Sequence, residues 1–260
     1  MNRCSILFVL VVLLTFGNVY GQRTVVSSGG TLKDKYSKKS GNLMISGAVA
    51  KFGRVKNNSV VTDTIRLYNA GNKAITLSTG KLPDHLTIVF QPASLAPASE
   101  GTMVLSYNVP KKNDYGFVLD RFEVITNDSI TPVKTFSASA TFEEYFAPMS
   151  GLDSMNAPVA GFDNTVYDYG KVKAGEKIPH TFVLRNSGKN ELVILKTKSN
   201  CNCLQVILSK SKIAAGDSAL VNVNLDTFGK EGPDSRRLNV FLNDYRMPSP
   251  VLEMKGEVYH

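Results

Sequence analysis

The residues best suited to chemistry in this 260-residue chain are Cys201 and Cys203, which flank Asn202. In an extended segment, residues two apart have Cα atoms about 6.6 Å apart, which is the upper limit for a disulfide. A Cys201–Cys203 bridge therefore requires a bend, and a strained bridge is more easily reduced. Alternatively, the two thiolates supply half of a tetrahedral metal shell. A structural or bridged pair is the simplest interpretation, and metal binding and thiol redox chemistry stay open beside it.

His180 is the residue that could add a third metal ligand. The pattern predicts strands at residues 181–185 and 192–195, joined by the turn Asn186-Ser187-Gly188-Lys189. If these strands form a hairpin, the start of the first lies beside the end of the second, near the cysteines. The sequence therefore offers Cys201, Cys203 and His180 as a candidate metal site.

The other polar residues carry weaker signals. His85 follows Pro83-Asp84 in a predicted turn and His260 ends the chain, so we expect both at the surface. One loop contains three acids, but a calcium loop needs more oxygen ligands at regular spacing; the acids are Asp226, Glu231 and Asp234. The chain has no Gly-x-Ser-x-Gly, no phosphate-binding glycine loop and no His-Glu-x-x-His. We therefore expect no catalytic activity and no cofactor.

Residues 1–21 have the pattern of a signal peptide. Arg3 precedes an apolar run from Ile6 to Phe16, and small residues allow cleavage before Gln22. That run is too short to span a bilayer, which takes about 20 residues, and no other stretch is long and apolar enough. We therefore expect an exported protein without a transmembrane span. The periplasm is the expected compartment, with outer-membrane association or an extracellular location as alternatives.

The charge distribution argues against a nucleic-acid partner. The whole chain carries a formal net charge of +8, or about +7 without Arg3. Its basic residues are scattered in pairs such as Lys38-Lys39, Lys111-Lys112 and Arg236-Arg237, whereas a nucleic-acid surface needs a clustered stripe. Weak attraction to anionic envelope surfaces is compatible with this balance.

The chain contains an internal repeat. Shifted by 117 residues, Phe52-Gly53-Arg54-Val55-Lys56 aligns with Tyr169 to Lys173, and Thr64 to Gly71 aligns with Thr181 to Gly188. Near the end of each copy the shift is 116, where Asn127-Asp128 aligns with Asn243-Asp244. One β module has therefore been duplicated.

Period-2 alternation dominates both copies and no stretch keeps a helical period. In residues 220–225 we expect Val221, Val223 and Leu225 to point inward and Asn222 and Asn224 outward. About seven short strands per copy, separated by turns, predict a sandwich of two antiparallel sheets. The fold class is thus all-β, with two tandem sandwiches after a cleaved signal peptide.

The predicted boundaries follow composition. A signal peptide covers residues 1–21, a flexible basic arm 22–41, the first sandwich 42–143, a linker 144–161 and the second sandwich 162–260. The arm is polar and glycine-, serine- and lysine-rich, so it cannot bury enough apolar surface to become ordered. The linker holds apolar residues, which predicts that it packs between the modules: Tyr145, Phe146, Met149, Leu152 and Met155.

The second module resembles the bacterial DUF1573 family. The resemblance rests on Tyr169-Gly170-Lys171-Val172, Asn186-Ser187-Gly188, Cys201-Asn202-Cys203 and the closing Lys255-Gly256-Glu257-Val258. It implies an immunoglobulin-like sandwich similar to the PapD, ASH and MSP groups, in an exported, envelope-associated protein of Bacteroidetes-type bacteria. The first module resembles the family weakly and has Pro83-Asp84-His85-Leu86 where the cysteines would be.

Three functional hypotheses follow. The first is a non-catalytic binding or scaffolding protein of the cell envelope, which recognises envelope proteins through sandwich surfaces, an added edge strand or a cleft set by the linker. The second is a periplasmic thiol- or metal-handling protein that uses Cys201 and Cys203. The third is a surface adhesin for glycans or peptidoglycan, which needs exposed aromatic residues; Tyr115, Phe117 and Tyr245 are the loop candidates.

Overall fold

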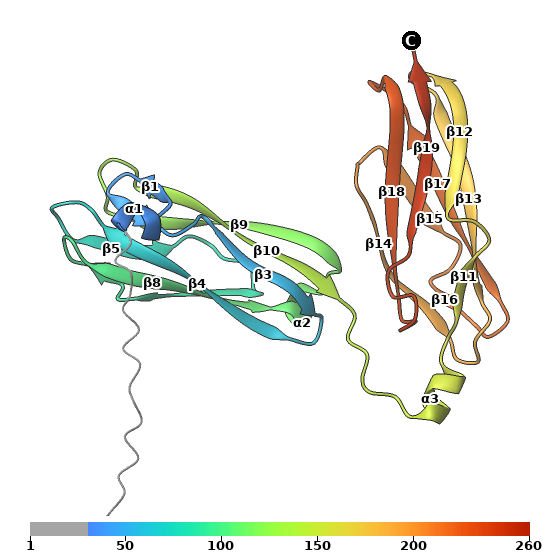
Figure 1. Cartoon of the computed structure of the whole chain (residues 1–260), viewed down its shortest axis with the longest axis horizontal. Coiled ribbons are helices and arrows are strands. Elements are labelled where there is room, and N and C mark those ends of the chain that lie inside the picture. The colour runs from blue at the N-terminus through green and yellow to red at the C-terminus, as the bar shows by residue number, and fades with distance from the viewer. Residues whose placement is uncertain (1–30) are drawn as a thin grey trace, which may run out of the picture.

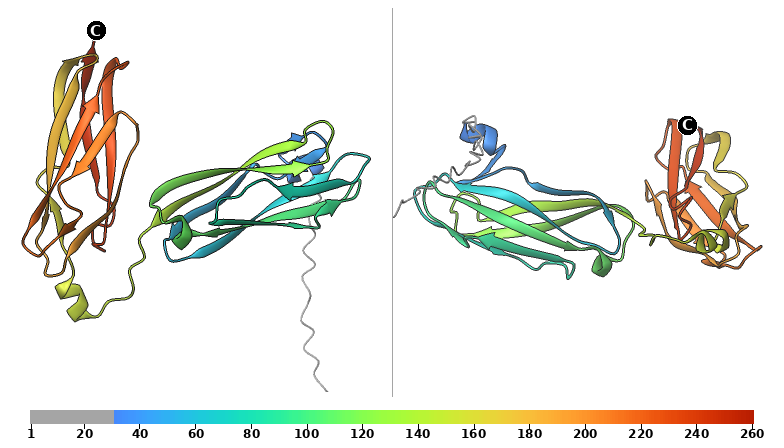
Figure 2. Two further views of the ribbon diagram at one scale, coloured as in Figure 1. Left: turned by 180° about the vertical axis from the view of Figure 1, so that it is seen from behind. Right: turned by 60° about the horizontal axis from the view of Figure 1, so that its bottom comes forward.

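The computed structural model describes residues 31–260, and the predicted signal peptide and the first part of the arm lie outside this range. Two elongated sandwiches follow one another along the chain, and one end of the first faces a sheet of the second (Figures 1 and 2). The predicted all-β fold with two tandem immunoglobulin-like sandwiches is confirmed.

Module one contains two five-stranded sheets, in the orders β1-β2-β4-β8-β6 and β3-β10-β9-β5-β7. All its strand pairs are antiparallel except β3 with β10. The elements are α1 (Leu32–Lys35), β1 (Lys38–Ser40), β2 (Leu43–Ile45), β3 (Val49–Lys56), β4 (Val60–Asn69), β5 (Ile75–Thr79), β6 (Leu86–Gln91), β7 (Ser94–Leu95), β8 (Glu100–Asn108), α2 (Val109–Lys112), β9 (Gly116–Thr126) and β10 (Val133–Glu143).

Module two repeats this plan with the sheets β11-β13-β17-β15 and β12-β19-β18-β14-β16, and its parallel pair is β12 with β19. Helix α3 lies in the segment between the modules. The elements are α3 (Gly151–Asn156), β11 (Ala160–Phe162), β12 (Val166–Lys173), β13 (Lys177–Asn186), β14 (Leu192–Ser199), β15 (Leu204–Leu208), β16 (Lys212–Ile213), β17 (Ser218–Asp226), β18 (Gly232–Leu242) and β19 (Val251–Tyr259).

Each module closes its own apolar core between its two sheets. Side chains that alternate along a strand point to opposite faces, and one face of each sheet is covered by the other sheet. The inward prediction for β17 is confirmed, because Val221, Val223 and Leu225 are at most 3% exposed.

The repeat extends to the side chains that tie the turns. Asn69 and Asn186 each end a strand, and each accepts a hydrogen bond from the glycine N–H two residues on, 2.9 Å from Gly71 and 3.0 Å from Gly188. Each also donates from Nδ2 to two backbone carbonyls of its own module, at 2.8 and 2.9 Å. Both asparagines thus make hydrogen bonds that backbone groups would otherwise make. Because they make the same bonds at the same place in both copies, they confirm the duplication.

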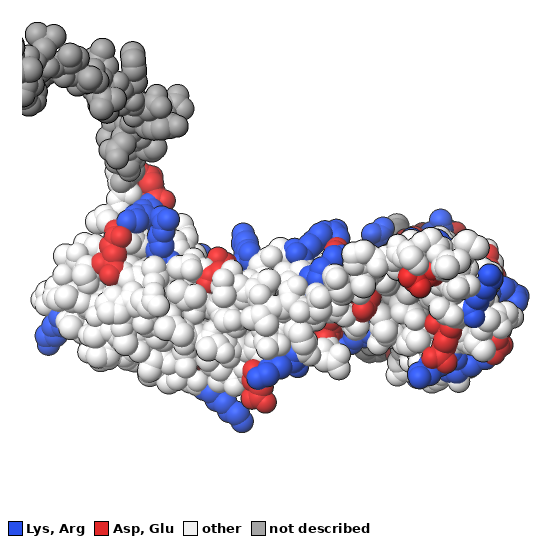
Figure 3. All heavy atoms as spheres, turned by 90° about the horizontal axis from the view of Figure 1, so that it is seen from below, with Lys and Arg blue, Asp and Glu red and all other residues white. Residues whose placement is uncertain are grey.

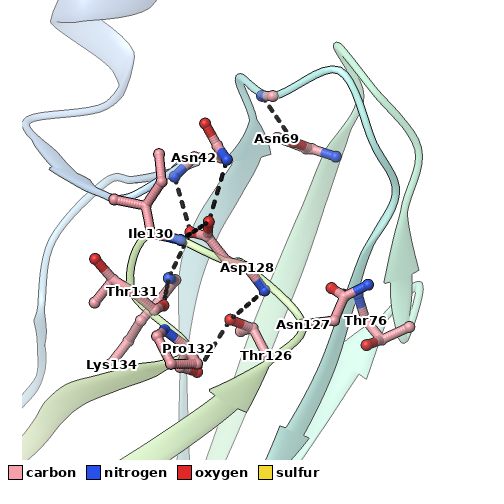
Figure 4. A network of polar contacts seen from close by, with 11 residues as sticks. Asn42, Asn69, Thr76, Thr126, Asn127, Asp128, Ile130, Thr131, Pro132 and Lys134 are labelled. Atoms are coloured by element: carbon pink, nitrogen blue, oxygen red, sulfur yellow. Dashed lines mark hydrogen bonds and ion pairs between the residues drawn. The ribbon is translucent and has the colours of Figure 1, made fainter.

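A second duplicated anchor is a buried aspartate, Asp128 or Asp244. Each accepts a 2.8 Å hydrogen bond from a backbone N–H at the start of a strand, from Asn42 just before β2 or from Ala160 at the start of β11. In module one alone, the carboxylate also pairs with the buried ammonium of Lys134 at 2.9 Å (Figure 4). The alternation along β10 indicates that Lys134 is buried, because it shares a face with the inward-facing Phe136 and Ala138.

The predicted flexible arm is wrong for residues 31–41. Thr31 caps α1 through Asp34, and β1 pairs with β2. Tyr36 is only 2% exposed, and its ring packs against the ring of Tyr68 with the two centroids 5.6 Å apart. One aromatic side chain and three residues of strand pairing thus order a segment whose average composition predicts disorder.

The apolar linker residues do not all pack between the modules as predicted. Leu152 and Met155 on α3 are 72% and 66% exposed, and Tyr145 and Met149 are also exposed. Phe146 is half-buried. The helix is held by its Ser150 cap and by two hydrogen bonds between Ser154 and module two. The Ser154 hydroxyl bonds to the Tyr245 hydroxyl at 2.9 Å, and the Ser154 carbonyl accepts from the Arg246 guanidinium at 2.9 Å.

Candidate functional site

A concave surface lies where the two modules meet. The loop between α2 and β9 of module one contacts β14 and β18 of module two, and an ion-pair group forms there. The Asp114 carboxylate lies 2.5 Å from Lys196 Nζ and 3.0 Å from Lys198 Nζ. Burial raises the pKa of Asp114, but the hydrogen bonds from Lys196 and Lys198 outweigh it and lower the pKa below its usual value. Asp114 is therefore charged and holds two cations of the other module.

Aromatic packing joins the modules beside these ion pairs. The rings of Tyr115 and Phe241 stack with centroids 5.5 Å apart, and Phe241 is 6% exposed. Gly116 has a φ of +68°, and a Cβ there would lie 2.7 Å from Phe241 Cζ. The absence of a side chain at Gly116 therefore allows Phe241 to approach the backbone of module one.

The Tyr115 hydroxyl ties the same loop to the linker. It donates to Glu144 at 2.7 Å, and Asn57 Nδ2 donates to the same carboxylate at 2.8 Å. Burial and the hydrogen bond to Glu144 raise the pKa of Tyr115 to about 12. The segment that leaves module one is thus fixed at its first residues.

A cleft of about 440 Å³ opens at this junction, which we call the junction cleft. It combines aromatic rings from both modules with a cationic pair, Arg54 and Lys56, that contacts Glu143. The hydrogen bonds from Arg54 and Lys56 lower the pKa of Glu143 despite its partial burial. The aromatic lining residues are Phe117, Phe142, Phe146, Phe241 and Tyr245.

The three aromatic candidates from the sequence converge here. Phe117 and Tyr245 line the junction cleft, and Phe117 is 65% exposed. Tyr115 instead packs on Phe241 and is not part of the lining. Sequence reasoning missed Asp114, Lys196 and Lys198, because a pair of residues more than 80 positions apart leaves no local pattern.

The two cysteines form a disulfide. Cys201 and Cys203 are bridged with Cα atoms 5.2 Å apart, which the bend at residues 200–203 allows. The Ser199 hydroxyl donates to the carbonyl of Cys201, and the carbonyl of Cys203 accepts from the N–H of Asp226 at 2.9 Å. Both cysteines are half-buried against the core of module two. In this form they carry no thiolate for metal binding.

The predicted approach of His180 to the cysteines is wrong. Strands β13 and β14 do not form a hairpin, because β13 pairs with β17 while β14 pairs with β18 in the opposite sheet. The His180 ring stacks on Tyr167 at 3.8 Å, and burial lowers its pKa. Within residues 31–260, no group of three or more His, Cys, Asp or Glu side chains is placed to hold a metal ion.

His85 is not a surface residue as predicted. Its side chain is 12% exposed, and its Nε2 lies 2.8 Å from Asp120. Asp120 also accepts from the Tyr107 hydroxyl and, at 2.7 Å, from Lys112. Burial raises the pKa of Asp120, but these hydrogen bonds lower it overall. In strand register His85 stands where module two has Cys203, so a polar cluster replaces the disulfide.

The remaining sequence candidates are separate from one another. Asp234 is buried and pairs with Arg236 and the Tyr169 hydroxyl, whereas Asp226 accepts from the N–H of Phe228. His260 is exposed, as predicted, and lies 3.8 Å from Glu231. The three acids of the loop therefore do not converge on one point.

We expect the disulfide to contribute modestly to stability. The ring that it closes spans three residues, so the chain-entropy relation gives about 1.5 kcal/mol. The variant with Cys201→Ser and Cys203→Ser should lose that amount in urea denaturation, and reduction of the unmodified protein should lose as much. A loss above about 4 kcal/mol would contradict a simple cross-link and point to a further role for the pair.

The comparisons with known proteins agree with this fold. Residues 160–258 match the family model described as "Protein of unknown function (DUF1573)", which confirms the predicted resemblance of module two. A crystal structure of a protein of unknown function from Porphyromonas gingivalis W83 is 17% identical, covers 84% of this chain and all of that one, and superimposes with a TM-score of 0.58. It shares the fold of the two modules.

A more distant similarity is to PapD-like domain 7 of human CEP192, an ASH/PapD-like domain. It is 11% identical over 45% of this chain and 94% of that one, with a TM-score of 0.34. No curated protein matches the chain. No helix between residues 31 and 260 is long and apolar enough to cross a membrane.

Proposed function

We propose that this protein is a non-catalytic binding protein of the bacterial cell envelope that recognises a partner protein at the junction cleft. The observation that carries the proposal is the cleft itself, which lies beside the contacts that Asp114, Tyr115 and Phe241 make between the two modules. Clefts between domains are preferred sites of recognition.

The chemistry of the cleft supports protein recognition. Exposed Phe117 offers an aromatic anchor, and aromatic residues dominate the binding energy of protein interfaces. The Arg54–Glu143 and Lys56–Glu143 pairs supply a polar rim. Glu143 and Glu144 are both engaged by neighbouring donors, which suits a rigid binding surface rather than proton transfer.

An extracytoplasmic location is part of the proposal. The signal-peptide pattern of residues 1–21 and the Cys201–Cys203 disulfide both support an oxidising compartment. Mixed charge supports an envelope protein rather than a nucleic-acid binder, and Figure 3 shows basic and acidic side chains interspersed over the face in view.

Site-specific photo-crosslinking in intact cells tests the proposal. A photoreactive amino acid at Phe117 should give one discrete adduct with an envelope protein, and Tyr245→Ala should reduce its yield several-fold. Leu119 is the matched control, because it is 45% exposed on the same strand β9 but does not line the cleft. Equal adducts from both positions, or none from Phe117, would overturn the proposal.

A further inference from the structure

A second surface of module two has the chemistry of a binding site. It is the outer face of β13, β17 and β15, which we call the amide face; it comprises Pro179, Thr181, Gln205, Ile207, Asn222 and Asn224. Module two contacts module one through β14 and β18, which belong to the opposite sheet. The amide face is therefore turned away from the junction cleft.

The strand register aligns the side chains of the amide face in rows that run across β13, β17 and β15. Asn224 lies between Pro179 and Gln205, and Asn222 lies between Thr181 and Ile207. Two depressions, of about 210 and 270 Å³, are neighbours because both are lined by Gln205 and Asn224, and we call the two together the groove. The groove ends at Phe228, which is 83% exposed.

The hydrogen-bonding capacity of this groove is only partly used. The Asn224 Oδ1 atom is buried and accepts no hydrogen bond from any residue between 31 and 260. A buried acceptor without a partner is unfavourable; a ligand hydroxyl that donates to it removes that cost, and this requires the Asn224 side chain to rotate toward the surface. The Asn222 Oδ1 atom accepts from Thr181 at 2.8 Å, which orients the Asn222 amino group for donation outward.

Module one shows that the fold does not need these amides. At the positions of Gln205 and Asn224 it has Thr87 and Ser106, which pair in the same register. At the position of Asn222 it has Val104. Asparagine is disfavoured in strands, so the two asparagines of β17 are unexplained by strand stability.

We propose that the amide face binds a neutral, hydroxyl-rich glycan chain. Carboxamides both donate and accept, and sugar hydroxyls do the same. An exposed phenyl ring at the end of the groove suits the apolar face of a pyranose ring. The charged groups that border the groove, Lys177 and Asp226, are opposite in sign and neighbours in register, which favours a ligand without net charge.

Side-chain amide NMR of the purified protein tests this site. Chitohexaose, cellohexaose and maltohexaose are titrated in turn, and at least one should shift the amide signals of Asn222, Asn224 and Gln205. Asn224→Ala and Phe228→Ala should each weaken that binding about tenfold, consistent with the loss of one buried contact. The matched control Ser106→Ala, at the same register position in module one, should leave it unchanged.

Three results would overturn the site. The first is that none of the glycans binds up to about 10 mM. The second is that both variants bind the glycan like the unmodified protein. The third is that an extended apolar peptide shifts the same amide signals while the glycans do not. The last result would assign the face to strand addition at the free edge of β15. Phe117→Ala in the junction cleft should not change glycan binding, which keeps this test separate from the proposed function.

Discussion

Replacing Asp128 by asparagine is expected to lower the free energy of unfolding of module one by about 3–5 kcal/mol, because it leaves a buried lysine without its counter-charge. The side chains of Lys134 and Asp128 are 1% and 0% exposed, and Lys134 Nζ also donates to the carbonyl of Thr131 (Figure 4). The asparagine keeps the shape of the site, removes the charge and replaces one of the two acceptor oxygens by an amino group. Hydrogen–deuterium exchange, resolved for each module, measures the loss.

The matched control is Asp244→Asn in module two. Asp244 occupies the duplicated position, and the residue that corresponds to Lys134 there is Pro250. We expect a loss of about 1–3 kcal/mol from its hydrogen bonds alone. Adding Lys134→Met to Asp128→Asn should recover part of the larger loss. If Asp128→Asn costs no more than Asp244→Asn, the ion pair is not what stabilises this corner of module one.

The same carboxylate makes the stability of module one depend on pH. Burial raises the pKa of Asp128, but the N–H of Asn42, the Lys134 ammonium and the N–H of Ile130 lower it overall. A carboxyl group whose pKa is lower in the folded state stabilises the fold at pH values above its unfolded pKa of about 3.9. That contribution is lost as the pH falls through the folded pKa. Acid unfolding of module one should therefore depend less on pH in the Asp128→Asn variant.

The second large effect is expected from Gly188→Ala. A Cβ at Gly188 would lie within 3.0 Å of three backbone atoms, from Ala157, Pro158 and Val159. Those backbone atoms are held, since the N–H of Ser187 donates to Val159 at 2.9 Å. The end of the linker must therefore move, and we expect module two to lose about 3 kcal/mol.

Gly71→Ala is the control for this substitution, because Gly71 occupies the same position in module one. Its Cβ would meet side-chain atoms of Asn42 at 3.0 Å, and a side chain can shift more easily than backbone. Its expected cost is about 1 kcal/mol. Urea denaturation followed by module-resolved exchange compares the two variants. Equal losses would show that the crossing of the linker over Gly188 is not the tight contact described above.

The errors in prediction share a physical cause. The turn residues after Asn186 predict a β-hairpin, yet the chain crosses there from one sheet to the other. Both connections use the same turn residues, and only the packing of the two sheets distinguishes them. Tyr36 and His85 were expected outside the core for a similar reason, since an isolated residue in a polar segment shows no period.

The sequence by itself determined the duplication, the all-β class and the inward faces of the strands, because turn chemistry and period-2 alternation are local properties of the chain. Only the tertiary structure decided which residues meet: Asp114 with Lys196 and Lys198 at the junction, and Asn224, Gln205 and Phe228 around one groove. These groups lie on different strands or different modules. Their proximity depends on sheet order and module contact, and neither of these has a period that the sequence can show.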